Sequence, residues 1–76
     1  MSAWDEKELQ AAIDAYLDML SRQQAGEPYS KAAKRRELCK GSLNNRSDQS
    51  IEYRMRNISA VLNDNGRQTL KGYIPA

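Results

Sequence analysis

The clearest structural signal in the chain is residues 5–20, which read DEKELQAAIDAYLDML. Apolar residues recur there at the three- and four-residue spacing of one helical face, and they are Leu9, Ala12, Ile13, Tyr16, Leu17 and Leu20. Asp5, followed three residues later by Glu8, is typical of an N-terminal capping box. Gly26 is placed to end the helix. The pattern predicts a helix over about residues 5–25, with the apolar stripe packed in the core.

Two further helices are each preceded by a serine and followed by a glycine. Ser30 can cap a helix over residues 31–40, and Ser47 can cap one over about residues 48–65. The last helix has one apolar stripe, which we expect to face the core. Its members are Ile51, Met55, Ile58 and Leu62, with Arg54 and Val61 on one shoulder.

The remaining segments complete a single domain spanning residues 1–76. Leu43, between the second and third helices, is predicted to point inward. Asn57 is expected to hydrogen-bond a loop backbone rather than a ligand. Residues 67–76 read as a short C-terminal tail packed back on the core. The fold class is therefore all-α: a three-helix bundle, helix-turn-helix-like, with that tail.

Composition limits the chemistry available to the chain. It has 76 residues, no histidine and one cysteine, Cys39. Histidine-based catalysis, histidine-ligated metals and an internal disulfide are thereby excluded. We expect no enzyme activity from this chain, no cofactor, no metal and no small-molecule substrate. No apolar run is long enough to span a membrane, and the lone cysteine suits a cytoplasmic location.

Charge is distributed unevenly along the chain. Residues 1–26 hold five acids and two bases, a net −3, whereas residues 27–76 hold ten bases and five acids, a net +5. The exposed side of the second helix is predicted to carry five cations, Lys31, Lys34, Arg35, Arg36 and Lys40. A basic surface of this kind attracts a polyanion such as the phosphate backbone of double-stranded DNA.

The third helix could then read a duplex. Arginine can bond guanine and glutamine can bond adenine, while a helix start and flanking cations can hold phosphates. The candidate DNA-binding residues are Lys34, Arg35, Arg36, Arg46, Ser47, Gln49, Tyr53 and Arg56. On the pattern alone, a protein–protein docking module without DNA binding remains an open alternative, as does a basic surface that only interacts with water.

Five segments together resemble a known family. They are AYLDML (15–20), GEPYSK (26–31), NRSDQSIEYR (45–54), NISAVL (57–62) and GYIP (72–75). They are similar to the N-terminal head domain of McrA-like HNH restriction endonucleases, which act on modified DNA. The resemblance implies a non-catalytic module of a bacterial restriction or defence protein, with cutting done by a separate HNH domain.

The resemblance also implies partners and context. Double-stranded DNA, including modified DNA, would be one partner, and other domains of the same polypeptide would be another. We therefore expect the chain to be the N-terminal module of a longer protein, with a free-standing copy as the alternative.

Overall fold

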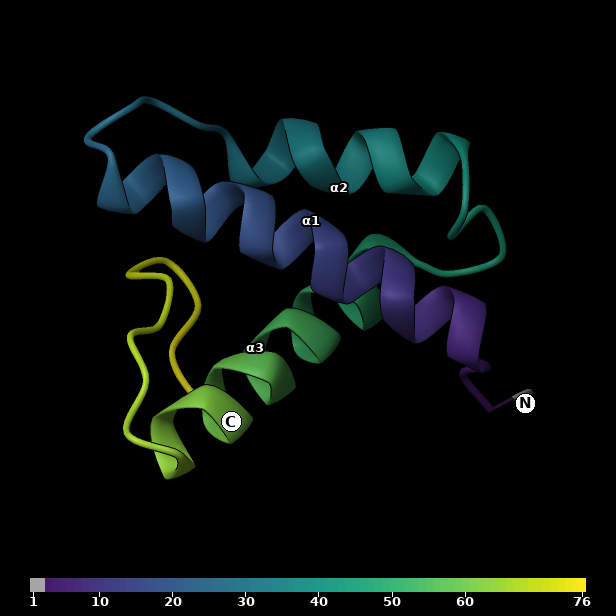
Figure 1. The fold of residues 1–76 in the computed structure, drawn as a ribbon. Coiled ribbons are helices and arrows are strands. Elements are labelled where there is room, and N and C mark those ends of the chain that lie inside the picture. Colours follow the sequence, from purple (N-terminus) through teal and green to yellow (C-terminus); the bar gives the residue numbers. More distant parts are fainter. Residues whose placement is uncertain (1–2) are drawn as a thin grey trace.

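The computed structural model describes residues 3–76 and contains three helices within them. They are α1 (Glu6–Gln24), α2 (Lys31–Lys40) and α3 (Asp48–Asp64). In Figure 1, α2 runs back alongside α1, α3 crosses on the other side of α1, and the tail loops back beside α3. No strand occurs within residues 3–76. The predicted all-α three-helix bundle is confirmed, and each helix begins and ends within one residue of its predicted bounds.

The helices begin where the sequence predicts because each start has a side-chain cap. The Asp5 carboxylate accepts the Glu8 backbone N–H at 2.8 Å, and the Glu8 carboxylate accepts the Asp5 N–H at 3.1 Å. Ser30 and Ser47 each accept the N–H of the residue three positions later. These contacts satisfy backbone donors that have no partner inside a helix.

Glycines end α1 and α3 by adopting a backbone conformation that other residues rarely enter. Gly26 has φ +73° and Gly66 has φ +68°, and each follows the C-cap residue of its helix. A side chain would be strained in this left-handed region. The chain therefore turns away at the two positions that the sequence indicates.

The core lies where the three helices, the α2–α3 connection and the tail meet. The predicted inward position of Leu43 is confirmed, because its side chain is fully buried. The predicted tail packing is confirmed by Leu70 and Tyr73, which are at most 2% exposed. The other buried apolar residues are Ala12, Ala15, Tyr16, Met19, Leu20, Ile51 and Met55.

The apolar stripe of α1 is only partly in this core, which corrects the sequence prediction. Ile13 is 37% exposed and Leu17 is 47% exposed, whereas Ala15 and Met19, outside the predicted stripe, are buried. The core takes the side of α1 that contains residues 12, 15, 16, 19 and 20. A domain of this size can cover only one sector of a helix.

The stripe of α3 shows the same displacement. Ile51 and Met55 are buried as predicted, but the next buried position is Ser59. Ile58 and Leu62 are only partly buried, and Val61 is 62% exposed. Part of the apolar surface of α3 thus lies outside the core, as it does on α1.

Within residues 3–76, no helix is both long enough and apolar enough to cross a membrane.

Candidate interaction surface

Lys34 is the first of the predicted DNA-binding cations, and it lies against α1. Its Nζ donates to Asp18 Oδ2 at 3.0 Å, and the lysine side chain is 23% exposed. Asp18 also accepts a hydrogen bond from Arg22. The hydrogen bonds from Lys34 and then Arg22 lower the pKa of Asp18 below its usual value. The prediction that Lys34 stands on the exposed side of α2 is wrong, because α1 supplies its acid.

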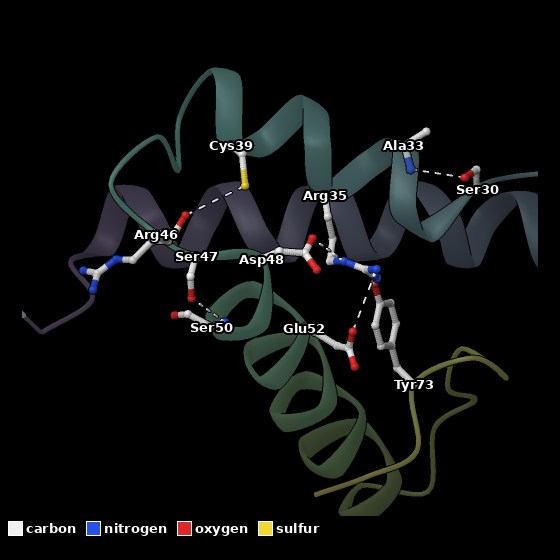
Figure 2. Close-up of polar contacts among 10 residues, drawn as sticks. All are labelled: Ser30, Ala33, Arg35, Cys39, Arg46, Ser47, Asp48, Ser50, Glu52 and Tyr73. Atoms are coloured by element: carbon white, nitrogen blue, oxygen red, sulfur yellow. Dashed lines mark hydrogen bonds and ion pairs between the residues drawn. The ribbon is translucent and has the colours of Figure 1, made fainter.

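Arg35 points from α2 toward α3 and the tail, as Figure 2 shows. It donates to Asp48 Oδ1 at 2.8 Å and to the Tyr73 hydroxyl at 2.8 Å, and lies 3.8 Å from Glu52 Oε2. Its side chain is 14% exposed, so the predicted exposed position is again wrong. Burial raises the pKa of the Tyr73 phenol, with the Arg35 hydrogen bond acting against it. Arg35 therefore joins α2, α3 and the tail.

Arg46 binds the start of α1. Its Nε and Nη2 donate to the two oxygens of Glu8 at 2.6 and 2.7 Å, and Nη2 also donates to the Ala3 carbonyl. The paired geometry is the strong, two-pronged form of an arginine–carboxylate contact. The Arg46 hydrogen bonds, with the Asp5 N–H, lower the pKa of Glu8 to about 2. This arginine is committed to holding the α2–α3 connection on α1.

The other five predicted residues fall into two groups. Ser47 caps α3, and Arg56 donates to the Ile74 carbonyl at 3.1 Å, so both serve the fold. Arg36, Gln49 and Tyr53 are exposed. The structure thus brings Arg35 together with acids of α3, and Lys34 and Arg46 together with acids of α1, rather than gathering all eight residues on one outer surface.

A different surface lies between α1 and α3. It is a groove of about 360 Å³ whose walls are almost entirely apolar. We call this surface the α1/α3 groove. It is lined by Leu9, Ile13, Leu17, Arg54, Asn57, Ile58, Val61 and Leu62. The exposed apolar side chains of Ile13, Leu17 and Val61 all belong to it.

Arg54 is the one charged side chain in this groove. Its guanidinium carbon lies 4.7 Å from the centre of the Trp4 ring, and that of Arg46 lies 4.9 Å from it. The Arg54 Nε is buried and has no hydrogen-bond partner. Among residues 3–76, Arg54 forms no ion pair. In the same range, two other partly buried cations without an ion pair, Lys31 and Arg56, each donate to a backbone carbonyl of the tail, whereas Arg54 makes no such bond.

Asn57 also lines the groove, one turn after Arg54. Its side chain makes no hydrogen bond to any residue that the structure describes. The expectation that Asn57 bonds a loop backbone is therefore wrong. The sequence pattern had placed Arg54 on the shoulder of the apolar stripe of α3. The signal that could have found the groove is the number of apolar residues on α1 and α3, which exceeds what one small core can cover.

The part of the chain that the structure describes contains no group of three or more acidic or cysteine side chains that could hold a metal ion. No protein-family model, curated protein or solved structure matches the chain.

Proposed function

We propose that this chain is a docking module that binds a helical segment of a partner protein in the α1/α3 groove. The observation that carries the proposal is the exposure of Ile13, Leu17 and Val61 together in one apolar hollow. Covering apolar surface is favourable by roughly 25 cal/mol per Å². A contiguous apolar patch on a folded protein is therefore a common sign of a protein interface.

The shape of the α1/α3 groove favours a helix as the occupant. Leu9, Ile13 and Leu17 are spaced four residues apart on α1, so the row is about 12 Å long. Ile58 and Leu62 form a second row on α3 with the same spacing. Rows at this spacing accept the side-chain ridges of another helix. The matching segment has two or three helical turns with apolar residues on one side.

The positions of the cations favour this function over DNA binding. Lys34, Arg35 and Arg46 would each have to leave an acid in order to contact a phosphate. Arg46 is only 10% exposed, and removing one member of a well-ordered ion pair leaves the other uncompensated. The apolar groove, in contrast, is open without any rearrangement of the fold.

A display selection tests the docking function. Amphipathic helical peptides of about 20 residues, long enough to be helical when bound, would be selected against the whole chain and measured by fluorescence anisotropy. Val61→Asp and Ile13→Asp should each lower affinity about tenfold or more, because they place a charge in the interface. Ile74→Asp is the matched control, since Ile74 is 72% exposed and lies outside the groove.

Two outcomes would refute the docking function. One is selected peptides whose affinity changes no more with Val61→Asp than with Ile74→Asp. The other is a selection that yields no peptide binding above background although wild-type protein is folded and present in excess. Each would mean that the groove does not receive a helix.

Duplex DNA binding is the second candidate, in line with the resemblance to the endonuclease head domain. It is supported by Arg36, Gln49 and Tyr53, which are exposed on α2 and at the start of α3. A labelled duplex should bind more weakly as the salt concentration rises. Arg36→Ala should reduce the slope of log binding constant against log salt concentration by about one. Lys7→Ala on α1 is the control and should leave that slope unchanged. Flat titrations at low salt would remove this candidate.

The restriction or defence context, the cytoplasmic location and the lack of catalysis belong to the same proposal. They are supported by the resemblance and by a sequence with no histidine and a single cysteine. In this view the chain acts by binding, and any catalysis lies in another domain or protein.

A further inference from the structure

The α1/α3 groove contains a cation that the fold leaves without an acid. Arg54 lies on α3, lines the groove, and forms no ion pair within residues 3–76. Its Nε is buried and has no hydrogen-bond partner. A buried donor without an acceptor is costly, so such atoms in native proteins call for a physical reason. The Nε is closed to solvent, so a bound partner would reach Arg54 through its two Nη groups, which are not among the buried atoms without partners.

The guanidinium of Arg54 is oriented by Trp4, which itself contacts Arg46. Its guanidinium lies over the ring of Trp4, 4.7 Å from the centre. Trp4 also lies under the guanidinium of Arg46, which Glu8 holds through two short hydrogen bonds. Stacking on an indole ring is favourable for a guanidinium and leaves its edge available for hydrogen bonds. Arg54 is thus positioned before any ligand arrives, which reduces the entropy lost on binding.

Asn57 adds a second polar group beside Arg54. It lies three residues further along α3, lines the same groove, and makes no side-chain hydrogen bond to a residue that the structure describes. An amide can donate two hydrogen bonds and a guanidinium five. Arg54 and Asn57 are the two polar residues in walls that are otherwise aliphatic.

Building on the proposed docking function, we propose that the helical segment bound in the groove carries an aspartate or glutamate that pairs with Arg54, with Asn57 as an additional donor. The carboxylate supplies an anion to a cation that the fold leaves without an acid, and the two Nη groups of an arginine can bond both oxygens of a carboxylate. The remaining groove residues are apolar, so the rest of the contact face of the segment is apolar as well.

The position of the carboxylate in the segment follows from the spacing on α3. Arg54 is four residues from Ile58 and eight from Leu62, which corresponds to about 6 and 12 Å along the helix axis. The acid should therefore lie about one helical turn from the nearest apolar anchor, at the end of the segment that lies by the start of α3.

The test uses the peptides selected for the groove, each made with glutamate or glutamine at the acidic position. On the wild-type chain the change from glutamate to glutamine should lower affinity about tenfold, the usual scale for a hydrogen-bonded charge. On Arg54→Gln the two peptides should bind equally. Arg54→Lys should give an intermediate difference, because it retains the charge without the fork. Arg36→Gln, an exposed arginine outside the groove, should behave like wild type.

The comparison of peptides on the wild-type chain requires no change in the protein, so it decides the matter even if Arg54→Gln does not fold. Some peptides could lose affinity on Val61→Asp, and so bind in the groove, yet bind equally well with glutamate and glutamine. That result would overturn the proposed pairing of a carboxylate with Arg54 and leave the docking function intact. Peptides insensitive to Val61→Asp would overturn the docking function instead.

Discussion

The hydroxyl groups of Tyr16 and Ser59 lie 2.7 Å apart inside the core and join α1 to α3. The same tyrosine oxygen accepts the backbone N–H of Leu70 in the tail at 2.9 Å. Tyr16 and Ser59 are both fully buried. One phenol oxygen therefore satisfies two polar groups that would otherwise be buried without partners, and it connects three separate segments of the chain.

Tyr16→Phe should destabilise the protein, because it leaves the Ser59 hydroxyl and the Leu70 N–H without their partner. The expected loss in the free energy of unfolding is about 1–3 kcal/mol. Urea denaturation followed by circular dichroism measures it. Tyr53→Phe is the control, since Tyr53 is 58% exposed and its change should stay within about 0.5 kcal/mol. Equal effects from the two variants would contradict this prediction.

Leu43→Ala should create a cavity where the α2–α3 connection enters the core. Leu43 is fully buried, and removing most of a buried leucine side chain costs about 2–5 kcal/mol. Thermal unfolding of the variant measures this loss of stability. Val61→Ala is the control, because Val61 is 62% exposed and its change should cost about 0.5 kcal/mol or less. A Leu43→Ala protein that unfolds together with Val61→Ala would show that Leu43 does not contribute to the core as described.

Glu8 should make stability fall at acid pH. Its pKa in the folded chain is about 2, below the ordinary value of 4.5, because Arg46 and the Asp5 N–H bind the charged form. Its contribution is therefore complete above about pH 4.5 and is lost as the pH falls toward 2. Wild type should lose more stability across this window than Glu8→Gln does.

Denaturant titrations at several pH values between 2 and 6 measure this difference. Glu6→Gln, an exposed change in the same first turn, should leave the wild-type pH dependence intact. Asp18, whose pKa is also lowered, is present in all three proteins, so its contribution to the pH dependence of stability cancels when they are compared. The prediction fails if wild type and Glu8→Gln lose stability in parallel.

Gly26→Ala should be unfavourable for a purely conformational reason. Gly26 has φ +73°, and a Cβ built there would meet no atom within 4 Å. The cost is then the left-handed backbone alone, roughly 1–2 kcal/mol. Gly26→Asn should cost less, because asparagine enters this region more readily. Thermal unfolding of both variants tests the order, and an alanine variant at least as stable as the asparagine variant would reverse it.

The helices could be predicted from the sequence because their signals are local. The caps at Asp5, Ser30 and Ser47 act within three residues, and Gly26 and Gly66 act on their own backbone. Such signals do not depend on the rest of the fold. For the same reason, the helix bounds agree with the structure to within one residue.

The ion pairs could not be predicted in this way, because the partners are far apart in sequence. Arg46 and Glu8 are 38 residues apart, and Arg35 and Asp48 are 13 apart. Summing charge along the chain separated an acidic segment from a basic one, whereas the fold places members of the two segments in contact. The predicted exposure of Lys34 was wrong for this reason. That of Arg35 was wrong because Asp48, an acid of the same basic segment, lies against it.

The α1/α3 groove was missed because helical periodicity identifies apolar residues but not the side that tertiary packing will cover. Ile13 and Leu17 fit the same spacing as Tyr16 and Leu20, yet only the second pair is buried. The difference arises from where α2, α3 and the tail lie around α1. The DNA-binding set itself stays a prediction.

The internal pairing of Asp18 with Lys34 and of Glu8 with Arg46 has a kinetic consequence. Paired charges produce little field beyond about 10 Å in a physiological electrolyte, so these four side chains do not draw a partner from a distance. Long-range attraction of a partner must come from the cations that form no ion pair within residues 3–76, such as Arg36 and Arg54. Differences in affinity among ligands of one surface should arise mostly from how long each complex lasts.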